Sequence, residues 1–156
     1  MAVAQPVRPR PPHPGTSVPI RVLLVEDMQQ LRGVVTELLQ SLGEFQVVAE
    51  VSTEAEAKSW LEDHTGGWEL AVVDLILEQG TGMGVISKCR QTSKNGRIVV
   101  LSDYATPGIR KHCLNLGANA VFQKSSEASA FADYCAALAV NATAPPKSPE
   151  AGPPAT

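Results

Sequence analysis

Short runs of apolar residues recur along the chain, and stretches with helical periodicity separate them. Five runs have the length of a strand, namely residues 20–25, 45–51, 70–74, 97–101 and 120–122. Most of them are nearly continuous in apolar residues, which is typical of strands buried on both faces of a parallel sheet. The pattern therefore predicts five buried strands.

The first two intervening stretches carry clear helix signals. Apolar residues at helical spacing precede Gly43, where a helix would stop; they are Leu31, Val34, Val35, Leu38, Leu39 and Leu42. Thr53 and Glu56 form a capping-box pattern at the start of a second helix. We expect that helix to bury three residues, Ala57, Trp60 and Leu61.

Three further helices follow the later strands. A loop with Gly80 and Gly82 leads into a helix whose inward-facing residues include Val85, Ile86 and Cys89. An N-cap threonine and a first-turn proline, Thr106 and Pro107, open a helix that runs through Leu116 to Gly117. The last helix is expected over residues 126–140.

Strands that alternate with helices imply a parallel sheet covered on both faces, because the crossovers are right-handed. We predict a flavodoxin-like, doubly wound α/β fold with strand order 2-1-3-4-5. A Rossmann nucleotide-binding domain is the competing fold. It is disfavoured because Glu26-Asp27 follows the first strand in place of a glycine-rich loop, and residues 80–84 lack the GxGxxG pattern.

Proline is concentrated at the two ends of the chain. Eleven of the twelve prolines fall in residues 1–19 or 141–156, and neither segment has periodic apolar residues. We expect a single domain over residues 20–140 between two disordered tails, 1–19 and 141–156.

Charge and hydropathy narrow the classes of partner. Residues 20–140 contain ten Lys and Arg against fifteen Asp and Glu, without a basic cluster, which argues against nucleic acid binding. No apolar stretch approaches the ~20 residues of a membrane span, so we expect a cytoplasmic protein without membrane insertion. Three widely spaced cysteines suggest reduced thiols, not disulfides or a metal site.

Polar residues follow four of the predicted strands. Because the carboxyl ends of parallel strands share one edge of the sheet, these side chains should converge; they are Glu26, Asp27, Asp74, Ser102 and Lys124. Carboxylates gathered at one edge repel one another, so they share protons or bind a cation, and oxygen ligands favour Mg²⁺. We expect Asp27 and Asp74 to bind Mg²⁺ directly and Glu26 to bind it directly or through water.

The remaining groups suit a phosphoryl group. The Lys124 ammonium and the Ser102 hydroxyl would contact phosphoryl oxygens, and Asp74 would attack phosphorus and become an acyl phosphate. Taken one at a time, each residue also has an ordinary structural explanation: a strand-end hydroxyl, a solvated cation or a loop before a helix. The agreement of four strand ends favours the site.

The same residues resemble the receiver domain of two-component response regulators over about residues 20–140. Glu26-Asp27 resembles the acidic pair of that family, and Asp74 the phospho-acceptor, with Gly82 eight residues later. Ser102, 28 residues after Asp74, resembles the Ser/Thr switch, and Lys124 a further 22 residues on resembles the family lysine.

The resemblance implies that Asp74 accepts phosphate from a phosphohistidine on a histidine kinase or histidine phosphotransfer protein. It also implies that Mg²⁺ binds the backbone carbonyl of Ile76. On this interpretation the chain is a stand-alone, single-domain response regulator that acts through a downstream protein partner. It would be a switch with self-catalysed phosphorylation and dephosphorylation, not a metabolic enzyme.

Four positions depart from the family pattern. Val121 stands where an aromatic residue is usual, Ser125 replaces a proline after Lys124, Asp103 replaces a small residue, and Glu78 replaces a proline. Three of these departures, Val121, Asp103 and Ser125, keep open a pseudo-receiver that binds proteins without phosphorylation. A Mg²⁺-dependent hydrolase ranks last, because the Asp-x-Asp pattern of such enzymes is absent at Glu26-Asp27 and at Asp74.

Overall fold

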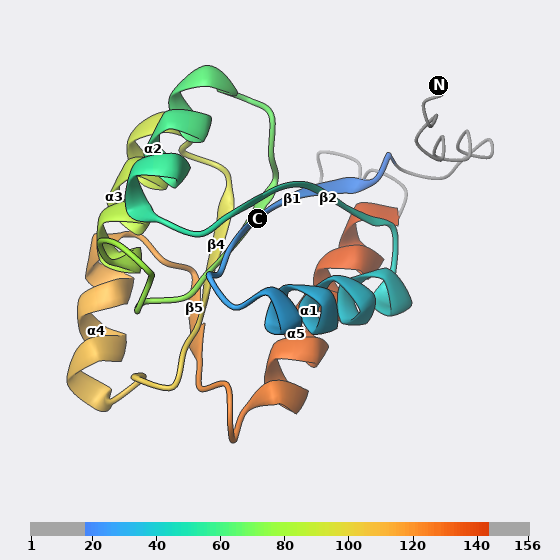
Figure 1. Ribbon diagram of the computed structural model, residues 1–156. Coiled ribbons are helices and arrows are strands. Elements are labelled where there is room, and N and C mark those ends of the chain that lie inside the picture. Colours follow the sequence, from blue (N-terminus) through green and yellow to red (C-terminus); the bar gives the residue numbers. More distant parts are fainter. Residues whose placement is uncertain (1–17, 144–156) are drawn as a thin grey trace, which may run out of the picture.

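The computed structural model describes residues 18–143, which form a five-stranded parallel sheet. The strands are β1 (Ile20–Val25), β2 (Phe45–Val51), β3 (Leu70–Val73), β4 (Arg97–Leu101) and β5 (Ala120–Phe122). Their order across the sheet is β2-β1-β3-β4-β5, so the predicted flavodoxin-like topology is confirmed. All five carboxyl ends therefore lie at the same edge (Figure 1).

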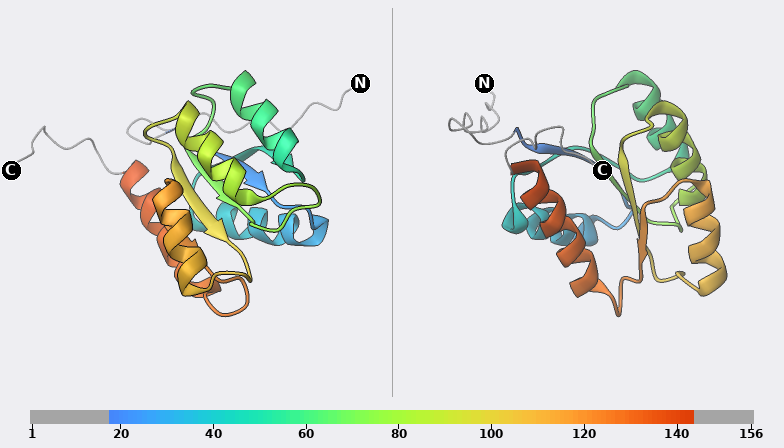
Figure 2. Two further views of the ribbon diagram at one scale, coloured as in Figure 1. Left: turned by 90° about the vertical axis from the view of Figure 1, so that its left-hand side faces the viewer. Right: turned by 180° about the vertical axis from the view of Figure 1, so that it is seen from behind.

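Five helices cover the two faces of this sheet. They are α1 (Gln29–Leu42), α2 (Glu54–Asp63), α3 (Gly82–Thr92), α4 (Pro107–Leu116) and α5 (Ala128–Thr143). Figures 1 and 2 show α1 and α5 on one face and α2, α3 and α4 on the other. Each helix returns the chain to the amino-terminal edge of the sheet, as right-handed crossovers between parallel strands require.

The sheet separates two hydrophobic cores. On one side, Leu23 and Val73 pack with α2, α3 and α4; on the other, Leu24 and Val72 pack with α1 and α5. Successive residues of a strand point to opposite faces, so a strand between two cores has no polar face. This explains why β1, β3 and β4 are almost continuously apolar.

The helices begin largely as their sequences predict. Thr53 Oγ1 accepts a hydrogen bond from Glu56 N at 3.1 Å, and Thr106 Oγ1 accepts one from Ile109 N at 3.3 Å. The Glu56 carboxylate, however, accepts from Ser52 N at 2.9 Å, one residue earlier than a capping box requires. The hydrogen bonds accepted by Thr53 Oγ1 and by the Glu56 carboxylate still satisfy backbone N–H groups at the start of α2.

Three details differ from the sequence-based expectations. Ala57 and Leu61 are buried, but Trp60 is only half-buried and stacks on the ring of His64, with centroids 4.3 Å apart. Gly82 is the first residue of α3 and not part of the preceding loop. Helix α5 covers Ala128–Thr143 where 126–140 was expected.

Most of both proline-rich segments lies outside the described residues, so the predicted disorder of the tails is not tested. Within residues 18–143, no helix combines the length and hydropathy needed to cross a membrane.

Candidate functional site

Polar residues follow β1, β3, β4 and β5 at the carboxyl edge of the sheet. Glu26 and Asp27 come directly after β1, Asp74 directly after β3, Ser102 directly after β4, and Lys124 two residues after β5. The strand pairing fixes them there, since Val25 of β1 is in register with Val73 of β3, and Leu101 of β4 with Phe122 of β5.

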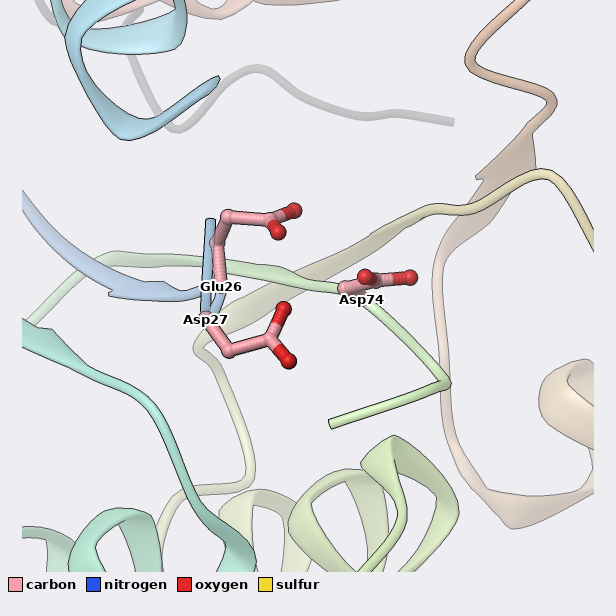
Figure 3. A group of neighbouring side chains, drawn as sticks. All are labelled: Glu26, Asp27 and Asp74. Carbon is pink, nitrogen blue, oxygen red and sulfur yellow. The ribbon is translucent and has the colours of Figure 1, made fainter. Parts of the chain in front are cut away.

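Glu26, Asp27 and Asp74 form a compact acidic cluster. One oxygen from each carboxylate lies within 4.8 Å of the others, and Figure 3 shows the three side chains side by side. Only 3% of Glu26 and 7% of Asp74 is exposed to solvent, while Asp27 is half-buried. Solvent therefore screens the repulsion among these carboxylates poorly.

Lys124 supplies the cation of this cluster. Its Nζ atom lies 3.0 Å from Glu26 Oε1 and 3.1 Å from Asp74 Oδ2. Burial by itself lowers the pKa of Lys124, but the contacts with the two carboxylates outweigh burial, and the net pKa is raised. One ammonium thus neutralises only part of the negative charge of three carboxylates.

Glu26 has an unusual electrostatic position. Burial raises the pKa of its carboxyl group, and the nearby negative charge of Asp74 acts in the same direction. The hydrogen bond from Met28 N to Glu26 Oε2, at 3.0 Å, and the contact with Lys124 oppose this rise. Because the net pKa is raised, an additional cation near Glu26 would relieve an existing electrostatic cost.

Ser102 is completely buried and bonded to the segment that carries Lys124. Ser102 N donates to Phe122 O at 3.0 Å, and Lys124 N donates to Ser102 O at 3.2 Å. The hydroxyl oxygen accepts a hydrogen bond from Tyr104 N at 3.2 Å. Any displacement of this hydroxyl would therefore disturb the start of the loop between β4 and α4.

The loop between β3 and α3 approaches Asp74 closely at Gly82. A Cβ atom on Gly82 would lie 2.1 Å from the Asp74 carbonyl oxygen, so no other residue fits without a backbone shift. Gly82 N also donates to Leu75 O at 2.9 Å. Glycine is thus required at position 82, because two backbone segments approach each other closely there.

Glu54, at the start of α2, forms hydrogen bonds with the end of the β3–α3 loop that precedes α3. Its carboxylate accepts from Thr81 N at 2.9 Å and pairs with Lys58 at 2.7 Å, while Glu54 N donates to Gln79 O at 3.0 Å. Ile76, whose carbonyl was predicted to bind Mg²⁺, belongs to the loop so fixed. No sequence signal predicts the contact between Glu54 and Thr81, because these residues are 27 positions apart.

Arg110, on α4, connects three segments of the chain through hydrogen bonds. Its guanidinium donates to Ala105 O and Val121 O, each at 2.9 Å, and to Glu127 Oε1 at 2.6 Å. The Glu127 carboxylate also accepts from Gln123 N at 2.8 Å. Sequence reasoning missed both residues, because Arg110 looks like an ordinary surface charge on α4 and Glu127 like one just before α5.

The residue set fits a magnesium site. All side-chain donors are carboxylate oxygens, which Mg²⁺ prefers, and two of the three carboxylates are largely withdrawn from water. The structure thus brings Glu26, Asp27, Asp74 and Lys124 together and joins Ser102 to the Lys124 segment by backbone hydrogen bonds. Their roles in chemistry remain predictions.

Solved structures with this fold are numerous. A LuxR-family two-component response regulator from Aurantimonas sp. SI85-9A1 matches with a TM-score of 0.69 and 23% identity, over 79% of this chain and 86% of that one. CheY in the CheX-CheY-BeF3-Mg+2 complex from Borrelia burgdorferi matches with a TM-score of 0.70 and 20% identity, over 78% and 90%. At these identities the likeness shows the fold alone.

Curated relatives and a family model identify the sequence more closely. The photosynthetic apparatus regulatory protein RegA of Rhodovulum sulfidophilum is 38% identical over 80 residues, covering 51% of this chain and 42% of RegA. RegA of Cereibacter sphaeroides is 29% identical over 118 residues, covering 76% and 56%. The chain thus spans about half the length of these relatives. The family model of the response regulator receiver domain matches residues 22–135. The chain therefore belongs to the response regulator receiver domain family.

Proposed function

We propose that this chain is a single-domain response regulator of two-component phosphorelay signalling, in which Asp74 accepts a phosphoryl group. The observation that supports this most directly is the position of Asp74. It is buried at the end of the central strand, in one cluster with Glu26 and Asp27, and 3.1 Å from Lys124. Family membership adds independent support.

The donor would be a phosphohistidine on a histidine kinase or histidine phosphotransfer protein. An Asp74 carboxylate oxygen attacks phosphorus, an O–P bond forms, and the P–N bond to the donor imidazole breaks, leaving an acyl phosphate and a free histidine. Lys124 is already oriented toward the attacking carboxylate and would contact a phosphoryl oxygen. Ser102, from the neighbouring strand end, would donate its hydroxyl to another.

A bound Mg²⁺ would neutralise negative charge on the phosphoryl oxygens and on the carboxylates. Asp27 and Asp74 would bind it directly, together with the Ile76 carbonyl, and Glu26 would bind it directly or through water. Such a cation would stabilise the ionised form of Glu26, whose pKa burial has already raised.

The response to phosphorylation would begin at Ser102. Its hydroxyl oxygen now accepts from Tyr104 N, and a shift toward the phosphoryl group would strain or break that bond. The loop before α4 would then move, and a downstream protein partner in the cytoplasm would distinguish the two states on this side of the domain. The chain would act as a switch rather than a metabolic enzyme.

A pseudo-receiver that binds partners without phosphorylation is the second candidate. The observation that favours it is Val121, which is buried at the position where the family usually has an aromatic residue. A hydrolase is not favoured, because only one carboxylate of the cluster lies at the end of β3.

Incubation with a small acyl phosphate and Mg²⁺, followed by intact-mass measurement, tests the proposal. We expect wild type to gain one phosphoryl mass, Asp74→Asn to gain none, and Asp133→Asn to behave as wild type. Asp133 is a matched control, since it is exposed on α5 and its side chain makes no hydrogen bond or ion pair within residues 18–143. Equal gains in wild type and Asp74→Asn would refute the assignment, and no gain in wild type would favour the pseudo-receiver.

A further inference from the structure

We propose that Asp103 is a positioning residue for Lys124, acting through a hydrogen bond to Ser125. Ser125 N donates to Asp103 Oδ1 at 3.1 Å, and this contact is called the Asp103–Ser125 latch below. The effect on reactivity rests on the proposed function of Asp74, whereas the effect on the turn that carries Lys124 does not.

The latch continues the pairing of β4 with β5 beyond the end of the sheet. The last residue pair of the two strands is Leu101 with Phe122. Backbone bonds then join Ser102 to Phe122 and to Lys124. The Asp103 side chain provides the next bond in the series, to the residue after Lys124.

A side chain is needed at this point because the strand has ended. Lys124 and Ser125 lie in a turn between β5 and α5, so the regular ladder of backbone bonds no longer reaches the Ser125 N–H. A carboxylate at position 103 extends from the neighbouring loop and accepts a hydrogen bond from this N–H group. Aspartate commonly satisfies backbone N–H groups in turns in this way.

The latch accounts for two departures from the family pattern together. Proline has no backbone N–H, so a proline at position 125 could not donate to Asp103. A small apolar residue at position 103 could not accept. Asp103 and Ser125 thus form a matched pair, and the carboxylate of Asp103 is oriented toward the turn instead of standing free beside the acidic cluster.

Hydrogen bonds consequently hold the backbone both at Lys124 and at the residue that follows it. The N–H of Lys124 is bonded to Ser102 O, and the N–H that follows it is bonded to Asp103. With the backbone fixed at both points, the long side chain is directed to within 3.1 Å of Asp74 Oδ2. Without the latch, one of the two restraints on the Lys124 backbone is lost.

Four variants separate this positioning role from a simple effect of charge. Asp103→Ala removes the acceptor, whereas Asp103→Asn keeps an oxygen acceptor without the charge. Ser125→Pro removes the donor, whereas Ser125→Ala keeps the backbone N–H and is the matched control. The measured quantity is the rate constant for phosphorylation of Asp74 by a small acyl phosphate at saturating Mg²⁺.

We expect the rate constant to fall roughly five-fold in Asp103→Ala and Ser125→Pro, the effect of one exposed hydrogen bond. Asp103→Asn and Ser125→Ala should stay within about two-fold of wild type. If Asp103 instead repelled the incoming donor, both Asp103→Asn and Asp103→Ala would react faster than wild type. That result would overturn the latch.

Amide hydrogen exchange provides a second readout that needs no phosphorylation. The Ser125 amide should exchange about five-fold faster in Asp103→Ala than in wild type and should stay protected in Asp103→Asn. Equal exchange in wild type and Asp103→Ala would refute the latch. Faster exchange in Asp103→Ala, in a protein whose wild type takes no phosphate, would support the latch and count against the proposed function.

Discussion

The ammonium of Lys124 lies 3.1 Å from Asp74 Oδ2, so the proposed phospho-acceptor is paired with a cation before any phosphoryl donor arrives. The same ammonium also contacts Glu26. Because one cation serves a cluster of three carboxylates, the fold carries uncompensated negative charge at this edge. Removing a charge from the cluster should therefore change stability, and the sign depends on which charge is removed.

Asp74→Asn should stabilise the metal-free protein by about 1 kcal/mol, because it removes one of three mutually repelling carboxylates. Urea unfolding in the presence of a chelator measures the free energy of unfolding. Addition of Mg²⁺ should narrow or reverse the difference, since wild type would then bind the ion more tightly than the variant. A metal-free variant less stable than wild type would contradict this view of the cluster.

Lys124→Met should have the opposite effect. It leaves Glu26 and Asp74 without a cationic partner in a poorly solvated site, which should cost about 2 kcal/mol of unfolding free energy in the absence of metal. Lys111→Met is the matched control, because Lys111 is exposed on α4 and makes no ion pair in the described part of the chain.

The double variant with Asp74→Asn should lose less stability than the sum of the two single effects predicts, since removing Asp74 relieves more repulsion when Lys124 is absent. Additive effects would show that Lys124 and Asp74 do not interact in solution.

The raised pKa of Glu26 predicts how stability varies with pH. The folded state binds the Glu26 proton more tightly than the unfolded state does. The stability linked to that proton is fully present below the pKa that Glu26 has in the unfolded protein. It is lost as the pH rises through the pKa that Glu26 has in the folded protein. Glu26→Gln, which imitates the protonated form, should therefore be more stable than metal-free wild type at pH 7.5.

This advantage should shrink as the pH falls toward the ordinary carboxyl range, where wild-type Glu26 becomes protonated in the folded state. Chemical unfolding of both proteins across this pH range measures the difference and cancels the titration of other groups. A constant difference at all pH values would show that the pKa of Glu26 is not raised.

Gly82→Ala should damage both the fold and the cluster. The new Cβ would meet the Asp74 carbonyl oxygen at 2.1 Å, and backbone atoms cannot move aside as a flexible side chain can. We expect a loss of about 3 kcal/mol of unfolding free energy.

Gly33→Ala, in α1, is the control, because no atom lies within 4 Å of its Cβ position. It should raise stability by up to about 1 kcal/mol through helix propensity. Similar stability of Gly82→Ala and wild type would mean that the β3–α3 loop is less closely packed than described.

The strand pattern and the strand-end chemistry were predictable because both depend on short-range signals. The apolar runs of β1, β3 and β4 follow from burial on two faces, and parallel pairing then gathers Glu26, Asp74 and Lys124 at one edge. Helix starts at Thr53 and Thr106 were equally local. These features need only the order of residues and the geometry of a parallel sheet.

The contacts that secure the loops were not predictable in this way. Glu54 reaches Thr81, Arg110 reaches Val121, and Asp103 reaches Ser125, each from a side chain whose sequence neighbourhood gives no hint of its partner. Such contacts depend on how far apart two loops lie after folding. In the sequence Asp103 is a departure from the family pattern, and only the structure shows its hydrogen bond to Ser125 N.

Arg110 joins α4, β5 and the turn before α5 through hydrogen bonds and one ion pair, on a side of the domain where Val121 offers no aromatic ring. About a third of the Arg110 and Glu127 side chains is exposed, so dissolved ions reach this pair. Salt weakens the attraction between exposed charges but hardly affects apolar packing. The ion pair that joins α4 to the turn before α5 therefore weakens as the ionic strength around the protein rises.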